Sequence, residues 1–419
     1  MSALAGIIAI GRKPLWLDEA LDVQWTHLGW HDYLSLTFRS EMGQAVWLLL
    51  LKPWLSIAGH GEVAARAPSV LFAAAACALL VPVGRTLLGG RLAGAAAGLL
   101  MACSAFVVHW EQQARTYTLA LFASVAVTYL FLRALRSSGW RWWLLYALVG
   151  VVAVYTHFFV GLVLIAHAAA AFTFRPRPGR PALYAGVTVV LLALPAAAFA
   201  IDMSSARGFI PPLTLDGFTA ELHLLAGGRW AIAAAAVAGA VLVAARVDRW
   251  KAVLLIGWLI VPIATTAALS IGHPSFIARY LIGVVPAACL CGAYLLTRIP
   301  RWWGAAAVVA TCAWALGPVA EWYRSPFSED WRAAAAYVDT SRAESDHLTV
   351  TTDWLTLVSG YYMKSRPDSR AIRGAVTWVV TIPADRYRVE QDIRARGYDI
   401  RVKKDFPGVV VLKAVRPLA

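Results

Sequence analysis

Residues 14–21 read Pro-Leu-Trp-Leu-Asp-Glu-Ala-Leu and place two adjacent carboxylates, those of Asp18 and Glu19, directly before an amphipathic run over residues 21–38. A short apolar segment over residues 2–10 precedes the pair. The two acids therefore lie where the chain would leave a membrane, and acidic groups at such a place are candidates for chemistry at the bilayer surface.

The composition of the chain predicts a polytopic membrane protein with the lipid bilayer as its main partner. Of its 419 residues, 60% are hydrophobic and only 15% are charged, unlike the balance of a soluble domain. The net charge of +14 does not indicate a nucleic-acid partner, because Lys and Arg do not gather on one helix or in one run. All five cysteines lie in apolar stretches, so the sequence supports neither a disulfide framework nor a zinc site.

Ten apolar segments are candidates for membrane spans, since a helix needs about 20 residues to cross the hydrocarbon core. They cover residues 67–88, 92–108, 116–135, 142–156, 158–174, 182–201, 229–247, 252–271, 280–297 and 302–320. We interpret residues 2–10 as a further, first span whose beginning is missing, which gives about eleven spans. Residues 12–66 are then an external first loop with interfacial helices.

Basic residues alternate along the connections and predict the orientation of the chain. Every second connection is basic, through Arg85 and Arg91; Arg133, Arg136 and Arg141; Arg175, Arg177 and Arg180; Arg246, Arg249 and Lys251; and Arg298 and Arg301. By the positive-inside rule these connections are cytoplasmic, so Asp18, Glu19 and the C-terminal segment lie outside the plasma membrane. The Ala-rich spans and the preference for Arg over Lys are typical of a GC-rich bacterial genome.

After a membrane domain over residues 1–321, the composition changes and predicts a small extracytoplasmic α/β domain over residues 322–419. Strands are expected over residues 347–352, 375–382, 398–402 and 409–415, and helices over residues 328–341 and 385–396. Ser328 is the expected N-cap of the first helix, with Glu329 and Asp330 in its first turn.

Six motifs follow one another along the chain: PLWLDEAL (14–21), EVAARAPSVLF (62–72), WEQQARTYTLALF (110–122), YTHFFVGL (155–162), ARYLIGVVP (278–286) and SEDWRAAAAYV (328–338). In order and spacing they resemble the GT-C fold glycosyltransferases related to protein O-mannosyltransferases, over nearly the whole chain. The resemblance implies transfer of a sugar, mannose or another hexose or pentose, from a polyprenyl-phosphate donor to an acceptor hydroxyl on the extracytoplasmic side. The acceptor would be a glycan, a lipid or a protein.

The resemblance makes Asp18 the catalytic residue. Inverting transfer needs a base that takes the proton of the acceptor hydroxyl, and a carboxylate within hydrogen-bond reach can do this. Consecutive residues do not share a helix face, so we expect Glu19 to have a different task, in acceptor positioning or in a salt bridge. The alternative is that the two acids only cap a helix that starts at Ala20.

The lipid phosphate leaves as an anion and needs cationic partners. Arg115 and Arg279 each lie at the external start of a span, where a guanidinium can bind phosphate oxygens in bidentate fashion or serve as an interfacial anchor. His157 could hydrogen-bond the sugar or phosphate, or be a helix-turn histidine bound to backbone. Gln112 and Tyr117, from the same motif as Arg115, complete the expected donor site.

Two differences from the family leave the donor sugar, the acceptor and the metal open. Where many relatives have His-Pro-Pro, residues 42–44 read Met-Gly-Gln, and the usual Gln-Glu-Ala-Arg reads Gln-Gln-Ala-Arg over residues 112–115. No compact cluster of Asp, Glu and His predicts a metal, although Asp18, Glu19 and the displaced Glu111 could bind a divalent cation.

Two other functions are alternatives to the enzyme. A transporter or flippase of a lipid-linked saccharide would bind the same donor, but it should carry ionisable residues near mid-bilayer, whereas most acids here lie at external ends. An inactive relative that serves as a scaffold is the other alternative.

Overall fold

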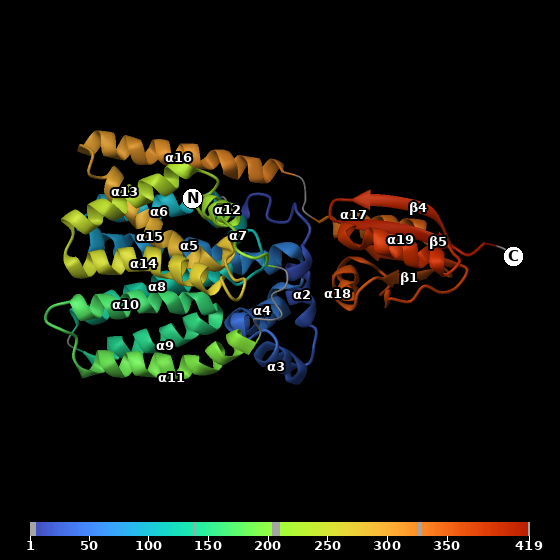
Figure 1. Ribbon diagram of the computed structural model, residues 1–419, viewed down its shortest axis with the longest axis horizontal. Helices are drawn as coiled ribbons and strands as arrows, with labels where there is room; N and C mark the ends of the chain where they lie inside the picture. Colours follow the sequence, from blue (N-terminus) through green and yellow to red (C-terminus); the bar gives the residue numbers. More distant parts are fainter. Residues whose placement is uncertain (1–5, 138, 203–209, 326–328, 418–419) are drawn as a thin grey trace. The chain divides into compact units, whose positions relative to one another are not determined.

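The computed structural model describes residues 6–137, 139–202, 210–325 and 329–417 (Figure 1). It divides into two compact units. The helical unit comprises Met1–Ile8, Leu34–Leu50 and Arg66–Tyr323, and the mixed unit comprises Ala9–Tyr33, Leu51–Ala65 and Arg324–Ala419. The C-terminal segment thus folds together with two parts of the predicted first loop.

Apolar helices build the helical unit, as the apolar segments predict. From the second motif onward they are α5 (Glu62–Leu88), α6 (Arg91–Ala102), α7 (Ala105–Glu111), α8 (Tyr117–Arg136), α9 (Trp140–Thr156), η2 (Phe158–Val160), α10 (Gly161–Thr173), α11 (Arg180–Asp202), α12 (Leu215–Leu225), α13 (Trp230–Arg246), α14 (Arg249–Leu269), η4 (Ala278–Val284), α15 (Val285–Leu296) and α16 (Arg301–Arg324). All ten apolar segments predicted from the sequence fall on these helices.

Fewer helices than predicted are long enough to cross a membrane alone. In the described part of the chain six have the length and apolarity of a span, or up to eight if two bent pairs each count as one. One pair, α12 with α13, bends by 84° at Gly227 and Gly228, whose positive φ angles of 66° and 76° suit glycine. Since α9 and α10 hold only 17 and 13 residues, the total of eleven spans stays a prediction.

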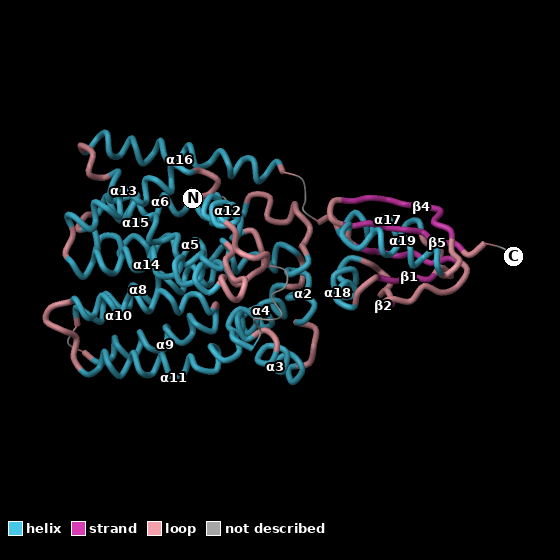
Figure 2. The backbone as a smooth tube through the Cα atoms, in the orientation of Figure 1, coloured by secondary structure: helices cyan, strands magenta, loops and turns pink. Residues whose placement is uncertain are grey.

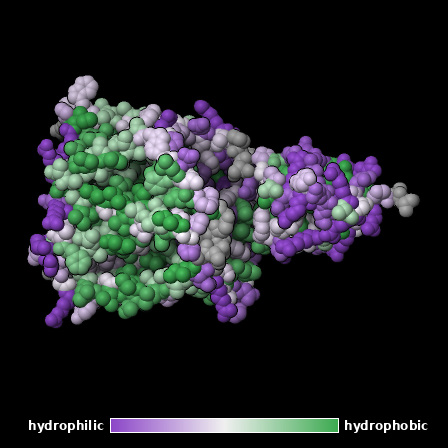
Figure 3. Space-filling view, viewed as in Figure 1, coloured by the Kyte–Doolittle hydropathy of each residue, from purple (hydrophilic) through white to green (hydrophobic). Residues whose placement is uncertain are grey.

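Small residues let the helices of this unit approach closely. A Cβ atom built on Gly239 of α13 would lie 2.0 Å from the carbonyl oxygen of Cys291 in α15, and one on Gly94 of α6 would lie 2.4 Å from that of Val81 in α5. Such backbone contact between helices is typical of packing within a bilayer. The outer surface suits lipid: only 17% of the most apolar window of α11 is buried, and Figure 3 shows a broad hydrophobic face over these helices.

The basic connections gather at one end of the helical unit. Figures 1 and 2 show the α10–α11, α13–α14 and α15–α16 connections side by side at that end. Figure 3 shows hydrophilic residues along the same edge, beyond the apolar face. In a row of antiparallel helices every second connection lies at the same end, so the alternating basic connections are expected to come together. Which side of the membrane this end faces stays a prediction.

A five-stranded sheet forms the C-terminal part of the mixed unit. Its strands are β1 (His347–Val350), β2 (Asp368–Ser369), β3 (Val376–Thr381), β4 (Asp399–Phe406) and β5 (Val409–Val415), and their order is β2-β1-β3-β5-β4. Strand β1 is parallel to both neighbours, whereas β5 is antiparallel to β3 and β4. The four strands predicted from the sequence are all present, and the two-residue β2 was missed.

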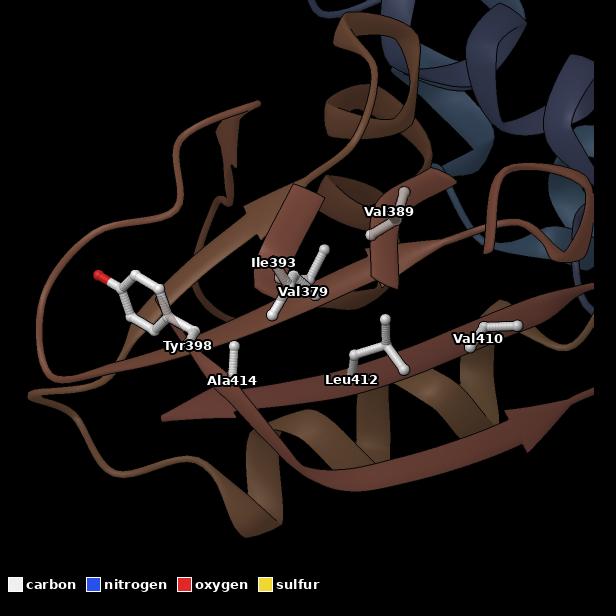
Figure 4. Packing of buried hydrophobic residues seen from close by; sticks show 7 residues of the cluster. All are labelled: Val379, Val389, Ile393, Tyr398, Val410, Leu412 and Ala414. Carbon is white, nitrogen blue, oxygen red and sulfur yellow. The ribbon is translucent and has the colours of Figure 1, made fainter. Parts of the chain in front are cut away.

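Helices α17 (Trp331–Ser341), α18 (Asp353–Tyr362) and α19 (Arg386–Ala395) accompany the sheet. Val389 and Ile393 lie one turn apart on α19 and pack onto Val379, Leu412 and other side chains of the sheet (Figure 4). The sequence analysis missed α18, whose aromatic and β-branched residues have low helix propensity. The N-cap of α17 is Asp330, and the predicted cap, Ser328, lies outside the described residues.

The first loop is helical, as predicted. It folds as α2 (Leu17–Trp25), α3 (Trp30–Arg39), η1 (Met42–Gln44) and α4 (Ala45–Ala58). Lys52 of α4 ties the preceding turn in place, because its ammonium group donates to the carbonyl oxygens of Thr26 and Leu28, each at 2.6 Å. The chain between α2 and α3 is thereby fixed within the mixed unit.

Candidate functional site

The predicted catalytic pair opens α2 of the mixed unit. The helix begins at Leu17, three residues before the start at Ala20 that the capping alternative assumed. Glu19 is fully buried and its Oε2 accepts the backbone N–H of Trp16 at 3.2 Å, so Glu19 caps the helix. Asp18 is half-buried and one residue nearer the N-terminus. The two carboxylates therefore have different surroundings, as their adjacent positions on a helix require.

Three consecutive backbone N–H groups ahead of Asp18 are held by side chains. Leu15 donates to the hydroxyl of Tyr362 at 2.6 Å, Trp16 to Glu19, and Leu17 to Oε2 of Glu329 at 3.0 Å. The first N–H groups of a helix have no partners within it, and here α2, α18 and the segment before α17 supply them. We call residues 15–19 the Asp18 turn, and its backbone is fixed from three sides.

A second layer of contacts orients Tyr362. Its hydroxyl donates to Oε1 of Glu62 at 2.7 Å, which leaves the oxygen lone pairs for the N–H of Leu15. Arg332 forms an ion pair with Glu62 and also donates to the carbonyl oxygen of Gly11 at 3.2 Å. Burial and the hydrogen bond to Glu62 raise the pKa of Tyr362, so the phenol keeps the proton that this arrangement needs.

Glu329 is the residue of this site that the sequence analysis missed. It was expected to be an ordinary acid in the first turn of the C-terminal helix, but it precedes the N-cap Asp330, whose carboxylate accepts the N–H of Ala333 at 3.0 Å. Glu329 instead accepts from Leu17 and from the indole N–H of Trp331 at 2.7 Å. Nothing in the sequence around Glu329 indicates that it binds the N–H of a residue as distant as Leu17.

The environment of Glu329 opposes its negative charge. Burial raises the pKa of Glu329, and the nearby carboxylates of Asp18 and Glu19 raise it further, whereas the hydrogen bonds from Trp331 and Leu17 lower it. The charges of Asp18 and Glu19 thus act on Glu329 near the N-terminus of α2, where the helix dipole partly stabilises negative charge.

We expect the stability of the protein to fall as the pH rises from the ordinary carboxyl range through the raised pKa of Glu329. A raised pKa means that the folded state binds the proton more tightly than the unfolded state, so deprotonation favours unfolding. Glu329→Gln keeps an oxygen for the N–H groups of Leu17 and Trp331 and cannot ionise, so this part of the pH dependence should disappear. Thermal unfolding in detergent between pH 4 and 7 measures it.

The matched control for that experiment is Glu344→Gln, because Glu344 is exposed in the loop before β1. Its pH dependence should follow that of the wild type. Parallel curves for the wild type and Glu329→Gln would contradict the raised pKa of Glu329.

The predicted donor residues lie in the helical unit, and three of them come together. The ring of His157, which is only 8% exposed, lies 5.9 Å from that of Tyr117 and 5.2 Å from that of Tyr280. The guanidinium of Arg279 lies over the Tyr280 ring, 5.7 Å from its centre. We call these four residues the aromatic–arginine cluster. Thr116 links the chain before α8 to the end of α9, since its hydroxyl donates to the carbonyl oxygen of Thr156 at 2.8 Å.

Arg115 and Gln112 lie in the connection between α7 and α8. The carbonyl oxygen of Arg115 accepts from the hydroxyl of Ser69 in α5 at 3.4 Å. The amide nitrogen of Gln112 donates to the carbonyl oxygen of Ile8 at 2.8 Å and to the hydroxyl of Tyr323 at 3.0 Å, and its oxygen accepts from an indole N–H of α16. The amide of Gln112 thus ties α16 to the N-terminal segment.

No group of three or more His, Cys, Asp or Glu side chains in the described part of the chain is arranged to hold a metal ion. Glu111 is buried in the helical unit, and Asp18 and Glu19 belong to the mixed unit.

The fold is that of the GT-C class. The structure resembles ArnT from Cupriavidus metallidurans in two crystal structures, one bound to undecaprenyl phosphate and one in the apo state. The TM-scores are 0.65 and 0.67 at 13% and 14% sequence identity, with 98% of this chain and 96% of ArnT covered. The oligosaccharyltransferase of Archaeoglobus fulgidus also matches, with a TM-score of 0.56, 11% identity, and 88% and 63% of the two chains covered.

A family model matches part of the sequence. Residues 45–199 match the family model described as dolichyl-phosphate-mannose-protein mannosyltransferase. Comparison with curated protein sequences gives no match. The resemblance to GT-C fold membrane glycosyltransferases, predicted from six short motifs, is confirmed by this model and by the shared fold, and the chain is a multi-pass membrane protein.

Proposed function

We propose that this protein is a glycosyltransferase that moves a sugar from a polyprenyl-phosphate donor to an acceptor hydroxyl on the extracytoplasmic side of the membrane. Asp18 is the general base, and the transfer inverts the anomeric centre. The observation that carries this assignment is the Asp18 turn. Its N–H groups are bound by Tyr362, Glu19 and Glu329, so the backbone that carries the Asp18 carboxylate is held in place.

The reaction requires one proton transfer and one displacement. Asp18 takes the proton of the acceptor hydroxyl while the oxygen of that hydroxyl attacks the anomeric carbon of the sugar. The bond from the anomeric carbon to the phosphate oxygen breaks at the same time. The products are the glycosylated acceptor and polyprenyl phosphate. A backbone held from three sides favours such a step, because a base contributes most when its geometry is fixed before reaction.

Arg115 and Arg279 neutralise the phosphate of the leaving lipid, and His157 and Tyr117 contact the sugar or the phosphate. Guanidinium groups bind phosphate oxygens in bidentate fashion. In the aromatic–arginine cluster, the guanidinium of Arg279 packs over the ring of Tyr280. The ArnT structure with undecaprenyl phosphate supports a polyprenyl lipid as the class of donor. Mannose, another hexose or a pentose are the candidate sugars.

The test is donor turnover by the purified protein in detergent, with a panel of polyprenyl-phosphate sugars and acceptors from an envelope extract. We expect one sugar to release polyprenyl phosphate, and Arg279→Ala to weaken donor binding at least tenfold. Arg133→Ala is the matched control, because the Arg133 guanidinium also covers an aromatic ring, that of Trp142 at 4.8 Å, in a predicted cytoplasmic connection. No turnover of any donor, with binding intact, would contradict the enzyme.

A transporter or flippase of the same lipid-linked saccharide is the second candidate. The observation in its favour is the pair of bent helices, since broken helices line the substrate sites of many transporters. Movement of donor across liposome membranes without release of polyprenyl phosphate would support it.

A further inference from the structure

The sheet of the mixed unit has a topological switch point. The connection from β1 through α18 leads outward to β2, whereas the connection from β3 through α19 leads in the opposite direction to β4. Because β5 is antiparallel to both β3 and β4, strands β1, β2, β3 and β4 all run the same way. In sheets of this kind, ligands bind at the carboxyl ends of the strands where the connections diverge.

A pocket of about 460 Å³ lies at this point. Its volume is within the range of small-molecule sites. It is lined by Thr349, Val350, Thr351, Thr352, Arg370, Ile372, Val379, Arg388, Val389, Asp392 and Arg396. The wall is therefore apolar where the sheet meets α19, hydroxyl-rich at the end of β1, and basic at the rim, with three arginines against one aspartate.

The three arginines line the pocket from two separate segments, the chain after β2 and helix α19 with the residue that follows it. Each now has an acidic neighbour: Arg370 lies 3.4 Å from Asp353, Arg388 lies 2.9 Å from Asp385, and Arg396 lies 2.9 Å from Asp392. These pairs are at the surface, where an ion pair contributes little, so an incoming anion can compete for the guanidinium groups.

Two features of the pocket lining favour a ligand there. The hydroxyl oxygen of Thr352 is buried and, among the residues that the structure describes, has no hydrogen-bond partner. Arg370 has a φ of 59°, a left-handed conformation that is unfavourable for a residue other than glycine. Its N–H bonds to the carbonyl oxygen of Val350 at 2.8 Å, which holds that conformation beside the pocket. Backbone strain of this kind often accompanies a binding site.

We propose that this switch-point pocket binds a saccharide that carries an oxyanion, a phosphate or a carboxylate. The guanidinium groups of Arg370, Arg388 and Arg396 take the anion, and the buried hydroxyl of Thr352 takes a hydroxyl group of the sugar. The pocket is too small and too polar for a polyprenyl chain. If the proposed function holds, on which this further step rests, the ligand is the anionic part of the acceptor.

The test is a calorimetric titration of the full-length protein in detergent with glucose 1-phosphate, glucuronate, glucose and inorganic phosphate. Glucose 1-phosphate or glucuronate should bind at least tenfold more tightly than glucose and than inorganic phosphate, and the tighter of the two identifies the anion. Arg370→Gly should weaken that binding at least tenfold. Its thermal midpoint should stay the same or rise, because glycine accepts the left-handed conformation without strain.

Arg394→Gln is the matched control. Arg394 is on α19 like Arg388, two residues before Arg396, and is paired with Glu390 at 3.9 Å, but it does not line the pocket. Its affinity should stay within twofold of the wild type, as should that of Asp18→Asn. Equal affinity for glucose, or an equal loss in Arg394→Gln, would overturn the proposal. These titrations do not depend on turnover, so their failure with transfer intact contradicts the pocket alone, whereas absent transfer with binding intact contradicts the proposed function.

Discussion

Asp18→Asn is expected to lower sugar transfer by about 10³-fold or more and to leave donor affinity within twofold. The amide has the shape of the carboxylate but cannot take the proton of an acceptor hydroxyl, and loss of a general base typically costs 10²–10⁴-fold. The helix should be undisturbed, because Tyr362, Glu19 and Glu329 bind the N–H groups ahead of it. Release of polyprenyl phosphate and donor binding, measured on the same preparation, separate the two effects.

Asp32→Asn is the control for this substitution. Asp32→Asn is the same chemical change in the first turn of α3. The side chain of Asp32 is 71% exposed and pairs with His31. Its transfer rate should match that of the wild type. Transfer by Asp18→Asn at more than a tenth of the wild-type rate would mean that another group accepts the proton.

Tyr362→Phe is expected to lower the turnover number by roughly 10- to 100-fold with little change in donor affinity. The substitution removes the acceptor for the Leu15 N–H and the donor to Glu62, and a hydrogen bond to a charged group contributes about 1.5–3 kcal/mol. The Asp18 turn would then be held from two sides only, which affects the orientation of the base rather than the donor site.

The neighbouring residue offers a matched comparison. The hydroxyl of Tyr361, on the same helix, donates to the carbonyl oxygen of His60 at 2.8 Å. Tyr361→Phe should keep the wild-type turnover number. An equal loss in both variants would indicate a general effect on the mixed unit, and no loss in Tyr362→Phe would remove Tyr362 from the positioning of Asp18.

The helices were predictable because their signal is local. Long apolar runs fix where helices form in a membrane protein, and every predicted segment is helical. The number of spans was not predictable to the same degree, since a bend such as that at Gly227 and Gly228 depends on packing between segments. Helix α18 was missed for a related reason: its residues favour a strand by propensity, and its place between β1 and β2 decides otherwise.

The candidate site was predictable only in part. The Asp-Glu pair stood out beside an apolar segment, and the loop motifs led to Tyr117, His157 and Arg279, which the structure brings near Tyr280. Glu329 and Tyr362 could not be assigned, because they act on residues more than 300 positions away through single hydrogen bonds. Sequence spacing carries no record of such contacts.

The mixed unit is assembled from three stretches of chain, and the ribosome makes these stretches at different times. Residues 9–33 leave the ribosome early, but the side chains that hold the Asp18 turn, Glu329 and Tyr362, are among the last to be made. A nascent chain therefore carries Asp18 on an unsupported loop until almost every predicted span has been made. Under the proposed function, biogenesis itself delays catalysis, and a truncated translation product would bind lipid without transferring sugar.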